Sequence, residues 1–342
     1  MKRNLLIFLV VAPLFGILLA MGNIYYKASI WKYEGPNREF TIGQGEAFSR
    51  INYRLSKEGL ISSSKIFHRY CQAKGLMTKF KSGQFVIKEN SNMLEVIDTL
   101  VFGVPLADKV TIPEGKNLYQ IAEILDEAKI SDKKEFIKWA KNEEFVKKLG
   151  IPASTVEGYL YPETYRFSKN SSPTLVISTM VDTFKREFKK IGLKHEKLND
   201  HEVVILASIV EKETGASFER PIIAGVFHNR LKKRMRLQSD PTTIYGIWEN
   251  YNGNIRKKHL LQKTPYNTYK IPALPKGPIA NPGVEALEAV LKPKEHNYLY
   301  FVSKNDGTHI FSTTYKEHRK AVNDFQKNRN ARRGKSWRDL KQ

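Results

Sequence analysis

The chain has 342 residues, a net charge of +22 and a single cysteine. This length allows two domains with sizeable cores, and 41% hydrophobic residues exclude a disordered chain. The lone Cys71 excludes an intramolecular disulfide, and the sequence contains no CxxC, HExxH or phosphate-binding glycine loop. We therefore expect no metal and no cofactor. The positive charge favours an anionic partner, such as nucleic acid, anionic lipid or an acidic cell-wall polymer.

The N-terminus predicts a membrane segment. No charged residue occurs from Asn4 through Tyr26, and as a helix this stretch would span roughly 34 Å, enough for a bilayer core. A cleaved signal peptide begins in the same way, but we find no convincing cleavage site and favour a retained single-pass anchor. Lys2 and Arg3 favour an N-terminus inside the cell, although Lys27 on the far side weakens this orientation. Export makes nucleic-acid binding unexpected.

Two segments of the N-terminal half repeat a pattern at an offset of 70 residues. The sequence TIGQG at 41–45 returns as TIPEG at 111–115, and the apolar positions that follow also recur. Each segment predicts a strand, a helix and a second helix, and then a glycine-led strand at 82–87 or 157–161. Small βα modules of this kind serve as scaffold or bind sugars, and both interpretations stay open.

A helix is also predicted at Glu202–Thr214, which contains neither Gly nor Pro and can be capped by Asn199 or Asp200. At 100° per residue an apolar stripe runs along it, and Glu213 lies on that stripe. Glu211 is about 200° round the helix and faces elsewhere, so the two carboxylates cannot act as an adjacent pair.

Glu213 is the candidate catalytic residue. A carboxyl against apolar neighbours keeps its proton near neutral pH, which a general acid for glycosidic cleavage requires. The alternative is that Glu213 is a buried ion-pair partner of Arg220 or Arg230. His228, on the next predicted helix at 218–231, is expected to be a partly buried helical residue.

The C-terminal half predicts further helices at 172–192 and 285–291 and a β-hairpin from Tyr298 to Ser312 with an Asp-Gly turn. Between residues 236 and 283 the sequence is polar, aromatic and rich in Pro and Gly. Such loops can line a saccharide groove, because amides, hydroxyls and tyrosine rings bind sugars, or they can be ordinary turns. The basic tail at 326–342 is expected to be disordered.

Several motifs together resemble one family. They are ASIVEKET at 207–214, NRL at 229–231, LQSDPTTIYG at 237–246, YNTY at 266–269, NPG at 281–283, EGYLYPETY at 157–165 and YLYFV at 298–302. This set is similar to the YceG-like (MltG) family of endolytic murein transglycosylases of bacterial inner membranes. The resemblance covers nearly the whole chain, including the anchor.

The resemblance implies an α+β fold with an N-terminal membrane helix, LysM-like βα modules and a mixed α/β catalytic domain. The expected divisions are 1–4 cytoplasmic, 5–26 anchor, 27–38 linker, 39–156 LysM-like region, 157–325 catalytic domain and 326–342 tail. The catalytic domain would lie on the periplasmic or external side of the inner membrane. The family cleaves nascent peptidoglycan between N-acetylmuramic acid and N-acetylglucosamine, leaves 1,6-anhydro ends and terminates strands beside peptidoglycan synthases (penicillin-binding proteins).

The family's catalytic glutamate matches Glu213. We expect the sugar groove to be lined by Gln238, Asp240, Thr242, Tyr245, Asn267 and Tyr269. Asp240 could instead form a turn before Pro241, and the role of Arg230 stays open. Two alternatives remain: a hydrolytic muramidase with Asp240 as base, and a non-catalytic wall-binding tether.

Overall fold

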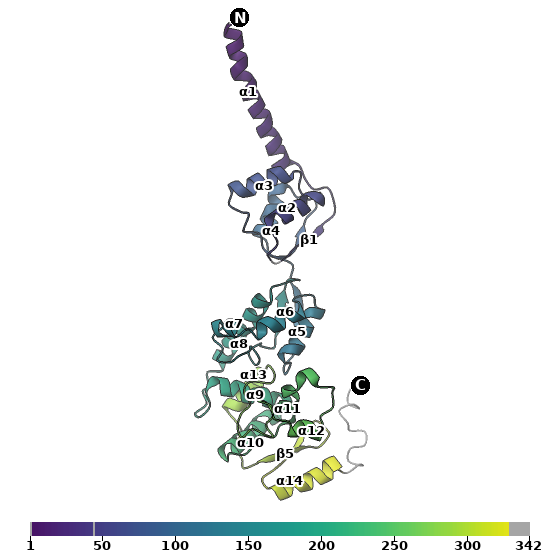
Figure 1. The fold of residues 1–342 in the computed structure, drawn as a ribbon, viewed down its shortest axis with the longest axis vertical. Helices are drawn as coiled ribbons and strands as arrows, with labels where there is room; N and C mark the ends of the chain where they lie inside the picture. The colour runs from purple at the N-terminus through teal and green to yellow at the C-terminus, as the bar shows by residue number, and fades with distance from the viewer. Residues whose placement is uncertain (1, 44, 328–342) are drawn as a thin grey trace. The chain divides into compact units, whose positions relative to one another are not determined.

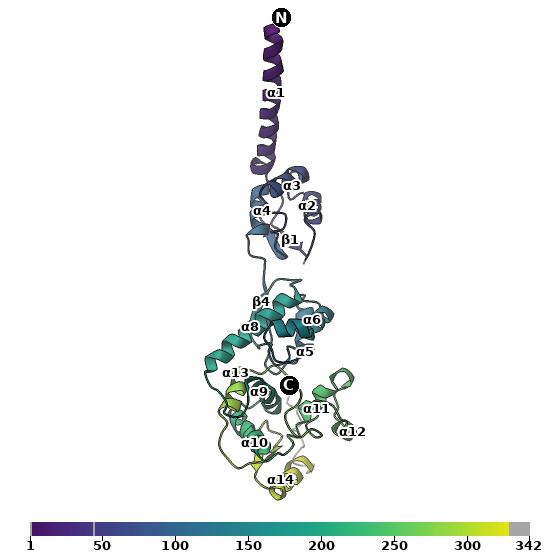
Figure 2. The same cartoon turned by 60° about the vertical axis from the view of Figure 1, so that its left-hand side comes forward.

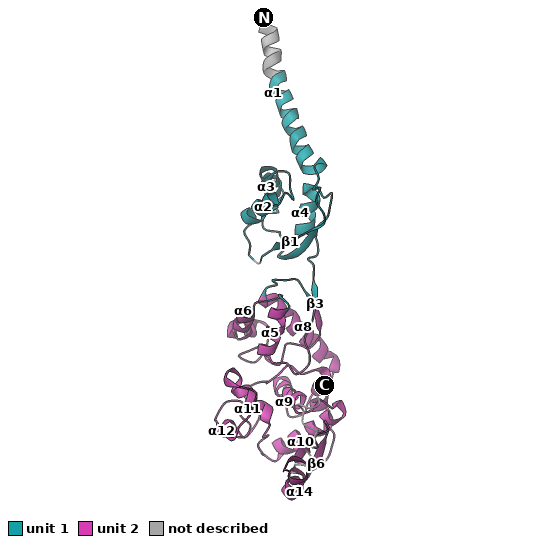
Figure 3. Cartoon of the chain, turned by 90° about the vertical axis from the view of Figure 1, so that its right-hand side faces the viewer, with its two compact units in different colours: residues 1–109, 128–131, 166–172 teal, residues 110–127, 132–165, 173–342 magenta. Residues whose placement is uncertain are grey.

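The computed structural model describes residues 2–43 and 45–327, so most of the predicted tail lies outside the described residues. The chain forms two compact units, coloured separately in Figure 3. The first contains residues 1–109, 128–131 and 166–172, and the second contains 110–127, 132–165 and 173–342. The boundary that we predict between 156 and 157 therefore falls inside the second unit.

The predicted N-terminal helix is present as α1 (Lys2–Tyr25), which continues into one π-helical turn at Tyr26–Ile30. Within the described residues, one helical stretch, Val11–Ile30, is long and apolar enough to cross a membrane. Large apolar side chains such as Phe15 and Leu18 are exposed along it, as expected of a surface that water does not normally meet.

The first repeat forms β1 (Arg38–Ile42), α2 (Phe48–Lys57), α3 (Ser64–Ala73) and β2 (Gly83–Ile87), and α4 (Met93–Val101) follows (Figure 1). β1 and β2 pair antiparallel with Phe40 opposite Phe85, and both rings are buried against the helices. The side chain of Ser63 caps α3, and Asn92 with Glu95 forms a capping box on α4, so polar residues define both helix starts.

The second repeat keeps the same order with one added helix. It comprises β3 (Asp108–Thr111), α5 (Leu118–Glu127), α6 (Lys133–Ala140), α7 (Glu143–Lys148) and β4 (Thr164–Phe167), and β3 pairs with β4. The strand that we predict at 157–161 is wrong. That segment is irregular: the backbone of Gly158 has φ = +86°, which lies outside the extended region that a strand requires.

The C-terminal half contains the four predicted helices α8 (Pro173–Ile191), α9 (Asp200–Glu213), α10 (Arg220–Lys232) and α13 (Val284–Leu291). Figure 2 shows α9 between α13 and α11 (Asp240–Gly246), and α9 contacts both. Asn199 caps α9 through a capping box with Glu202. Every residue from Val203 to Val210 is buried, so the predicted single stripe is incomplete: α9 is a core helix covered on all sides.

The last elements are the predicted hairpin, formed by β5 (Tyr300–Ser303) and β6 (His309–Ser312), and the helix α14 (Tyr315–Ala321), which runs into η4 (Val322–Lys327). The 236–283 region is less irregular than its composition suggests. It contains α11, a short 3-10 turn η3 (Trp248–Asn250) and α12 (Lys257–Leu261). Proline near the first turn of α11 is compatible with a helix because its missing N–H would be unpaired there anyway.

Candidate active site

Glu213 is the last residue of α9, where the buried helix reaches the surface of the second unit. Its side chain is partly buried. The pKa of the Glu213 carboxyl is raised to about 7, chiefly by burial and also by the charge of Asp240, while Ser239 and Arg230 act in the opposite direction. The group can therefore hold a proton near neutral pH and still be reached from solvent.

Arg230 on α10 faces this carboxyl but is held by the main chain. Its Nε donates to Leu299 O at 2.6 Å and its Nη1 donates to Leu237 O at 2.7 Å. The guanidinium also lies over the ring of Tyr300, with 5.3 Å from Cζ to the ring centroid. Arg230 thus fixes the loop that precedes α11 against β5 and supplies a positive charge beside Glu213.

The loop turns sharply before α11. Gln238 has φ = +50°, an uncommon conformation for a residue with a Cβ, and its N–H donates to Thr268 O at 3.3 Å. The next residue, Ser239, is the N-cap of α11, yet its side chain forms no capping bond. The turn therefore leaves the Ser239 hydroxyl free to face Glu213.

The Ser239 hydroxyl is buried, and within the described residues it has no partner in ordinary hydrogen-bond geometry. Its proximity nevertheless lowers the pKa of Glu213, so we describe the contact as a close polar approach rather than an aligned hydrogen bond. Sequence reasoning did not select Ser239. A serine before Asp-Pro that begins a helix is the signal that could have found it.

Asp240 and Tyr269 form a second polar pair next to Glu213. The Tyr269 hydroxyl donates to Asp240 Oδ1 at 2.7 Å, and burial together with the charge of Asp240 raises the pKa of Tyr269. Asp240 begins α11 and is exposed, as is Gln238. Of the six predicted groove residues, Asp240 and Tyr269 therefore lie near the Glu213 carboxyl, and Gln238 is an exposed residue of the adjoining turn.

Thr242 and Asn267 lie elsewhere, because both are fully buried. The Thr242 hydroxyl donates to Ser239 O at 2.6 Å, and the Asn267 amide donates to Gln262 O at 2.6 Å. Neither side chain is accessible to a saccharide in this structure. Both hold the 236–283 loops together, which explains why polar residues occur there without lining a groove.

Glu211 faces away from Glu213, as predicted. Its Oε1 accepts from Arg220 Nη2 at 3.1 Å, and its Oε2 accepts from the N–H of Gly283 at 3.1 Å. Arg220 also pairs with Glu285. The buried ion pair with Arg220 that was considered for Glu213 is therefore formed by Glu211 instead. His228, as predicted, is partly buried, and its Nε2 lies 3.0 Å from Val290 O.

Tyr245, the remaining predicted groove residue, belongs to a buried hydrogen-bond cluster around Glu157. The Tyr245 hydroxyl, the Leu118 N–H and the Asn281 amide donate to the Glu157 carboxyl at 2.9, 2.9 and 2.8 Å. Burial raises the pKa of Glu157 to about 7, and these donors act against that rise. We call Glu157, Leu118, Tyr245 and Asn281 the Glu157 cluster.

The geometry defines an α/β protein with one desolvated carboxyl at the end of a core helix, bordered by a constrained polar loop. Residues 40–324 match the YceG-like family. The chain therefore belongs to the YceG-like family.

Named relatives match over most of this chain. An endolytic murein transglycosylase of Bacillus subtilis (strain 168) is 36% identical, and the match covers 84% of this chain and 85% of the relative. Another endolytic murein transglycosylase, from Streptococcus pneumoniae (strain D39), is 26% identical over 88% of this chain, which spans 61% of that longer protein. A YceG-like protein of Listeria monocytogenes has a crystal structure that is 32% identical, with a TM-score of 0.56 over 85% of this chain and 99% of that one.

Proposed function

We propose that the chain is an endolytic murein transglycosylase that cleaves peptidoglycan glycan strands between N-acetylmuramic acid and N-acetylglucosamine. The observation that carries this proposal is the partly buried Glu213, with a pKa raised to about 7, in a chain 36% identical to an enzyme of that name. The product is a 1,6-anhydromuramic end, and the consequence is that strand elongation stops.

One carboxyl performs both proton transfers. Protonated Glu213 donates to the bridging oxygen while the C1–O bond breaks through an oxocarbenium-like state. The resulting carboxylate removes the proton of the muramic C6 hydroxyl, whose oxygen closes onto C1. Atoms balance without water, so no second carboxylate is needed. Arg230 offsets the negative charge that forms between the two transfers, and Ser239 orients the carboxyl.

Hydrolysis is the second candidate reaction, because Asp240 acts electrostatically on Glu213 and could serve as a base for water. Mass spectrometry of glycan digested by the purified full chain separates the two reactions. The proposal expects muramic ends 18 mass units lighter than reducing ends and resistant to borohydride (18 is about the mass of one water, the molecule that hydrolysis adds). Borohydride-reducible ends would establish a muramidase, and an absence of fragments would support a wall-binding tether.

The pH dependence follows from the protonated state of Glu213. We expect kcat to fall as pH rises above about 7, because the carboxyl then loses the proton that it must deliver. Replacing Asp240 by Asn removes a charge that raises the pKa of Glu213, so the falling limb should move to lower pH. Steady-state kinetics from pH 5 to 9 (roughly the range of a bell-shaped profile) measures both. If the falling limb of the kcat profile lies at the same pH in Asp240→Asn as in the wild type, the assignment of this limb to Glu213 is contradicted.

The N-terminal parts complete the proposal. The apolar stretch Val11–Ile30 supports a single-pass anchor in the bacterial inner membrane, with the catalytic domain on the external side. The strand–helix–helix–strand order of the first repeat supports a LysM-like module within 39–156, followed by a catalytic domain within 157–325. Peptidoglycan synthases are the expected neighbours, because strand termination acts on the chains that they extend.

A further inference from the structure

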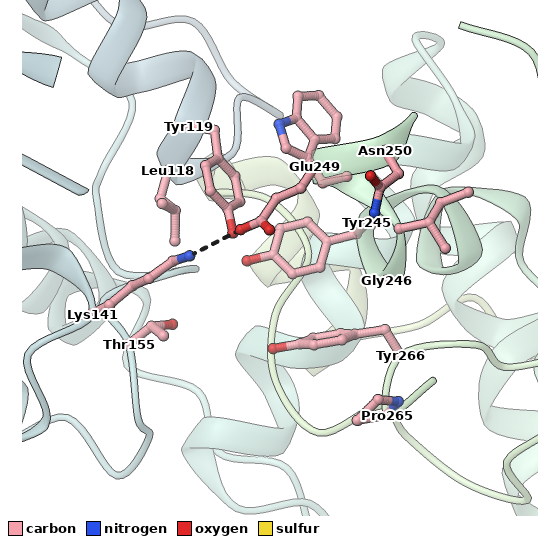
Figure 4. A pocket seen from close by; sticks show the side chains of 12 residues that line it. Leu118, Tyr119, Lys141, Thr155, Tyr245, Gly246, Glu249, Asn250, Pro265 and Tyr266 are labelled. Atoms are coloured by element: carbon pink, nitrogen blue, oxygen red, sulfur yellow. Dashed lines mark ion pairs between the residues drawn. The ribbon is translucent and has the colours of Figure 1, made fainter. Parts of the chain in front are cut away.

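A pocket of about 330 Å³ lies in the second unit, between the start of α5 and the end of α11 (Figure 4). Four aromatic side chains line it: Tyr119, Tyr245, Trp248 and Tyr266. All four are partly exposed, although rings of this size are usually buried when they only fill a core. The pocket size is within the range of sites that bind small molecules or single sugar units.

The rings are arranged as two pairs. Tyr119 and Trp248 stack with 6.2 Å between centroids and 15° between planes, and Tyr245 meets Tyr266 edge to face at 4.8 Å and 66°. Figure 4 shows the hydroxyl ends of Tyr245 and Tyr266 directed across the pocket toward the side lined by Lys141 and Thr155. Flat apolar faces with hydroxyls at one end match a sugar ring, which has apolar C–H faces and a polar edge.

An ion pair borders the same space. Lys141 Nζ lies 3.6 Å from Glu249 Oε1 and 4.7 Å above the centroid of the Tyr119 ring. Both charged side chains are exposed, so a surface pair of this kind contributes little to stability. It does place strong donors and an acceptor within reach of the hydroxyl and acetamide groups of a bound amino sugar.

The walls are held in place from behind by the Glu157 cluster. The carboxyl of Glu157 receives the Tyr245 hydroxyl from one wall and the N–H of Leu118, next to Tyr119, from the other. A single buried group therefore fixes the separation of the two aromatic walls. Walls that are already in position lose little conformational entropy when a ligand enters, which favours binding.

The pocket and the catalytic carboxyl lie at opposite ends of one helix. Asp240, whose charge acts on Glu213, begins α11, and Tyr245 and Gly246 end it. Tyr245 is five positions beyond Asp240 on this helix, or about 8 Å along the axis. One sugar ring cannot occupy both places, so the pocket would hold a different sugar of the same strand from those whose bond breaks.

We propose that this aromatic pocket is a distal subsite that binds one N-acetylated sugar ring of the glycan strand. The proposal rests on the proposed function for the identity of the polymer. It gives a physical reason for internal cleavage: a strand must extend well beyond the scissile bond to fill the pocket, so long strands bind more tightly than short ones.

The test measures binding without chemistry. Peptide-free glycan strands of graded length are titrated by calorimetry into the full chain carrying Glu213→Gln. We expect affinity to rise with length, and the added change Trp248→Ala to weaken long-strand binding about tenfold while leaving the shortest strands unaffected. Trp248→Phe retains a ring and should recover most of the affinity. Tyr315→Ala removes an exposed ring on α14, away from the pocket lining, and serves as the matched control.

The titration is repeated with strands that carry stem peptides. Three results would overturn the subsite: unchanged affinity after Trp248→Ala, an equal loss at every strand length, or an effect of Trp248→Ala that is seen only with the peptide-bearing strands. The last result would show that the pocket binds the stem peptide instead of a sugar ring. Failure of the proposed function is seen separately, as a wild-type chain that binds glycan with the expected length dependence and forms no anhydro ends.

Discussion

Changing Glu213 to Gln is expected to lower the turnover of murein glycan about a thousandfold, because general acid–base catalysis contributes roughly 10²–10⁴-fold. Gln has the size of Glu but cannot deliver a proton. The loss should appear in kcat and not in KM, since the loop before α11 that contacts the substrate is unchanged. High-performance chromatography of anhydro-ended fragments measures it. Wild-type amounts of these fragments from the variant would remove Glu213 from the chemistry.

The same substitution should stabilise the protein at high pH. In the folded chain the pKa of Glu213 is about 7, against an ordinary value of 4.5. As pH rises from 4.5 to 7, the unfolded chain loses this proton first, so wild-type stability falls across that window. Above it the penalty is constant and amounts to at most about 3 kcal/mol. The melting temperature of Glu213→Gln should therefore equal that of the wild type at pH 4 and exceed it at pH 8. Thermal melts of both proteins at the two pH values measure this difference.

Glu211→Gln is the matched control, since it makes the same chemical change two residues earlier on α9. Here the carboxylate accepts from Arg220 and from the N–H of Gly283, and its side chain is 5% exposed. Losing the negative charge should lower stability, because Arg220 keeps a weaker partner in the interior. Turnover should change far less than in Glu213→Gln. The two variants thus move stability in opposite directions and separate chemistry from folding.

The helices and the repeat could be predicted because their signals are local. Asn199 and Glu202 define the start of α9, and the Asp-Gly pair at 306–307 defines the hairpin turn. The spacing of 70 residues between the two TI–G motifs also predicted that a strand–helix–helix order occurs twice, although the second repeat has the added helix α7 and closes with β4 at Thr164–Phe167 instead of a strand at 157–161. The cap and the turn depend on residues within a few positions of one another, and the repeat shows in a comparison of two segments of the sequence, so no tertiary information was needed.

The errors occur where distant segments decide the structure. Thr242 and Asn267 look like groove residues, but the Thr242 hydroxyl lies 2.8 Å from that of Thr268, and the Asn267 Oδ1 accepts from the Thr243 hydroxyl at 3.1 Å. These partners are 26 and 24 positions away. Glu157 follows the pattern of a strand, yet its carboxyl is the acceptor for groups 39 and 124 positions away. α11 was missed because Asp-Pro is typical of a turn, although Pro also suits a first helical turn.

The Glu157 cluster leads to the second large expected effect. Glu157→Ala should destabilise the second unit by about 3 kcal/mol, because it leaves buried donors of Leu118, Tyr245 and Asn281 without an acceptor. A change of that size lowers the melting temperature by roughly 6–12 °C in a unit of more than 200 residues. Calorimetric melts of the full chain would measure it, with the first unit as an internal reference.

Tyr245→Phe is the graded control for this effect, because it removes one donor and keeps the ring. We expect a loss of about 1 kcal/mol, close to the value of a single hydrogen bond. If Glu157→Ala has the same melting temperature as the wild type, then the Glu157 carboxyl does not stabilise the packing of the segments that surround it. If Glu157→Ala has the wild-type melting temperature but no activity, Glu157 takes part in catalysis. Loss of stability together with weaker long-strand binding is the expected result, since the same carboxyl fixes both walls of the aromatic pocket.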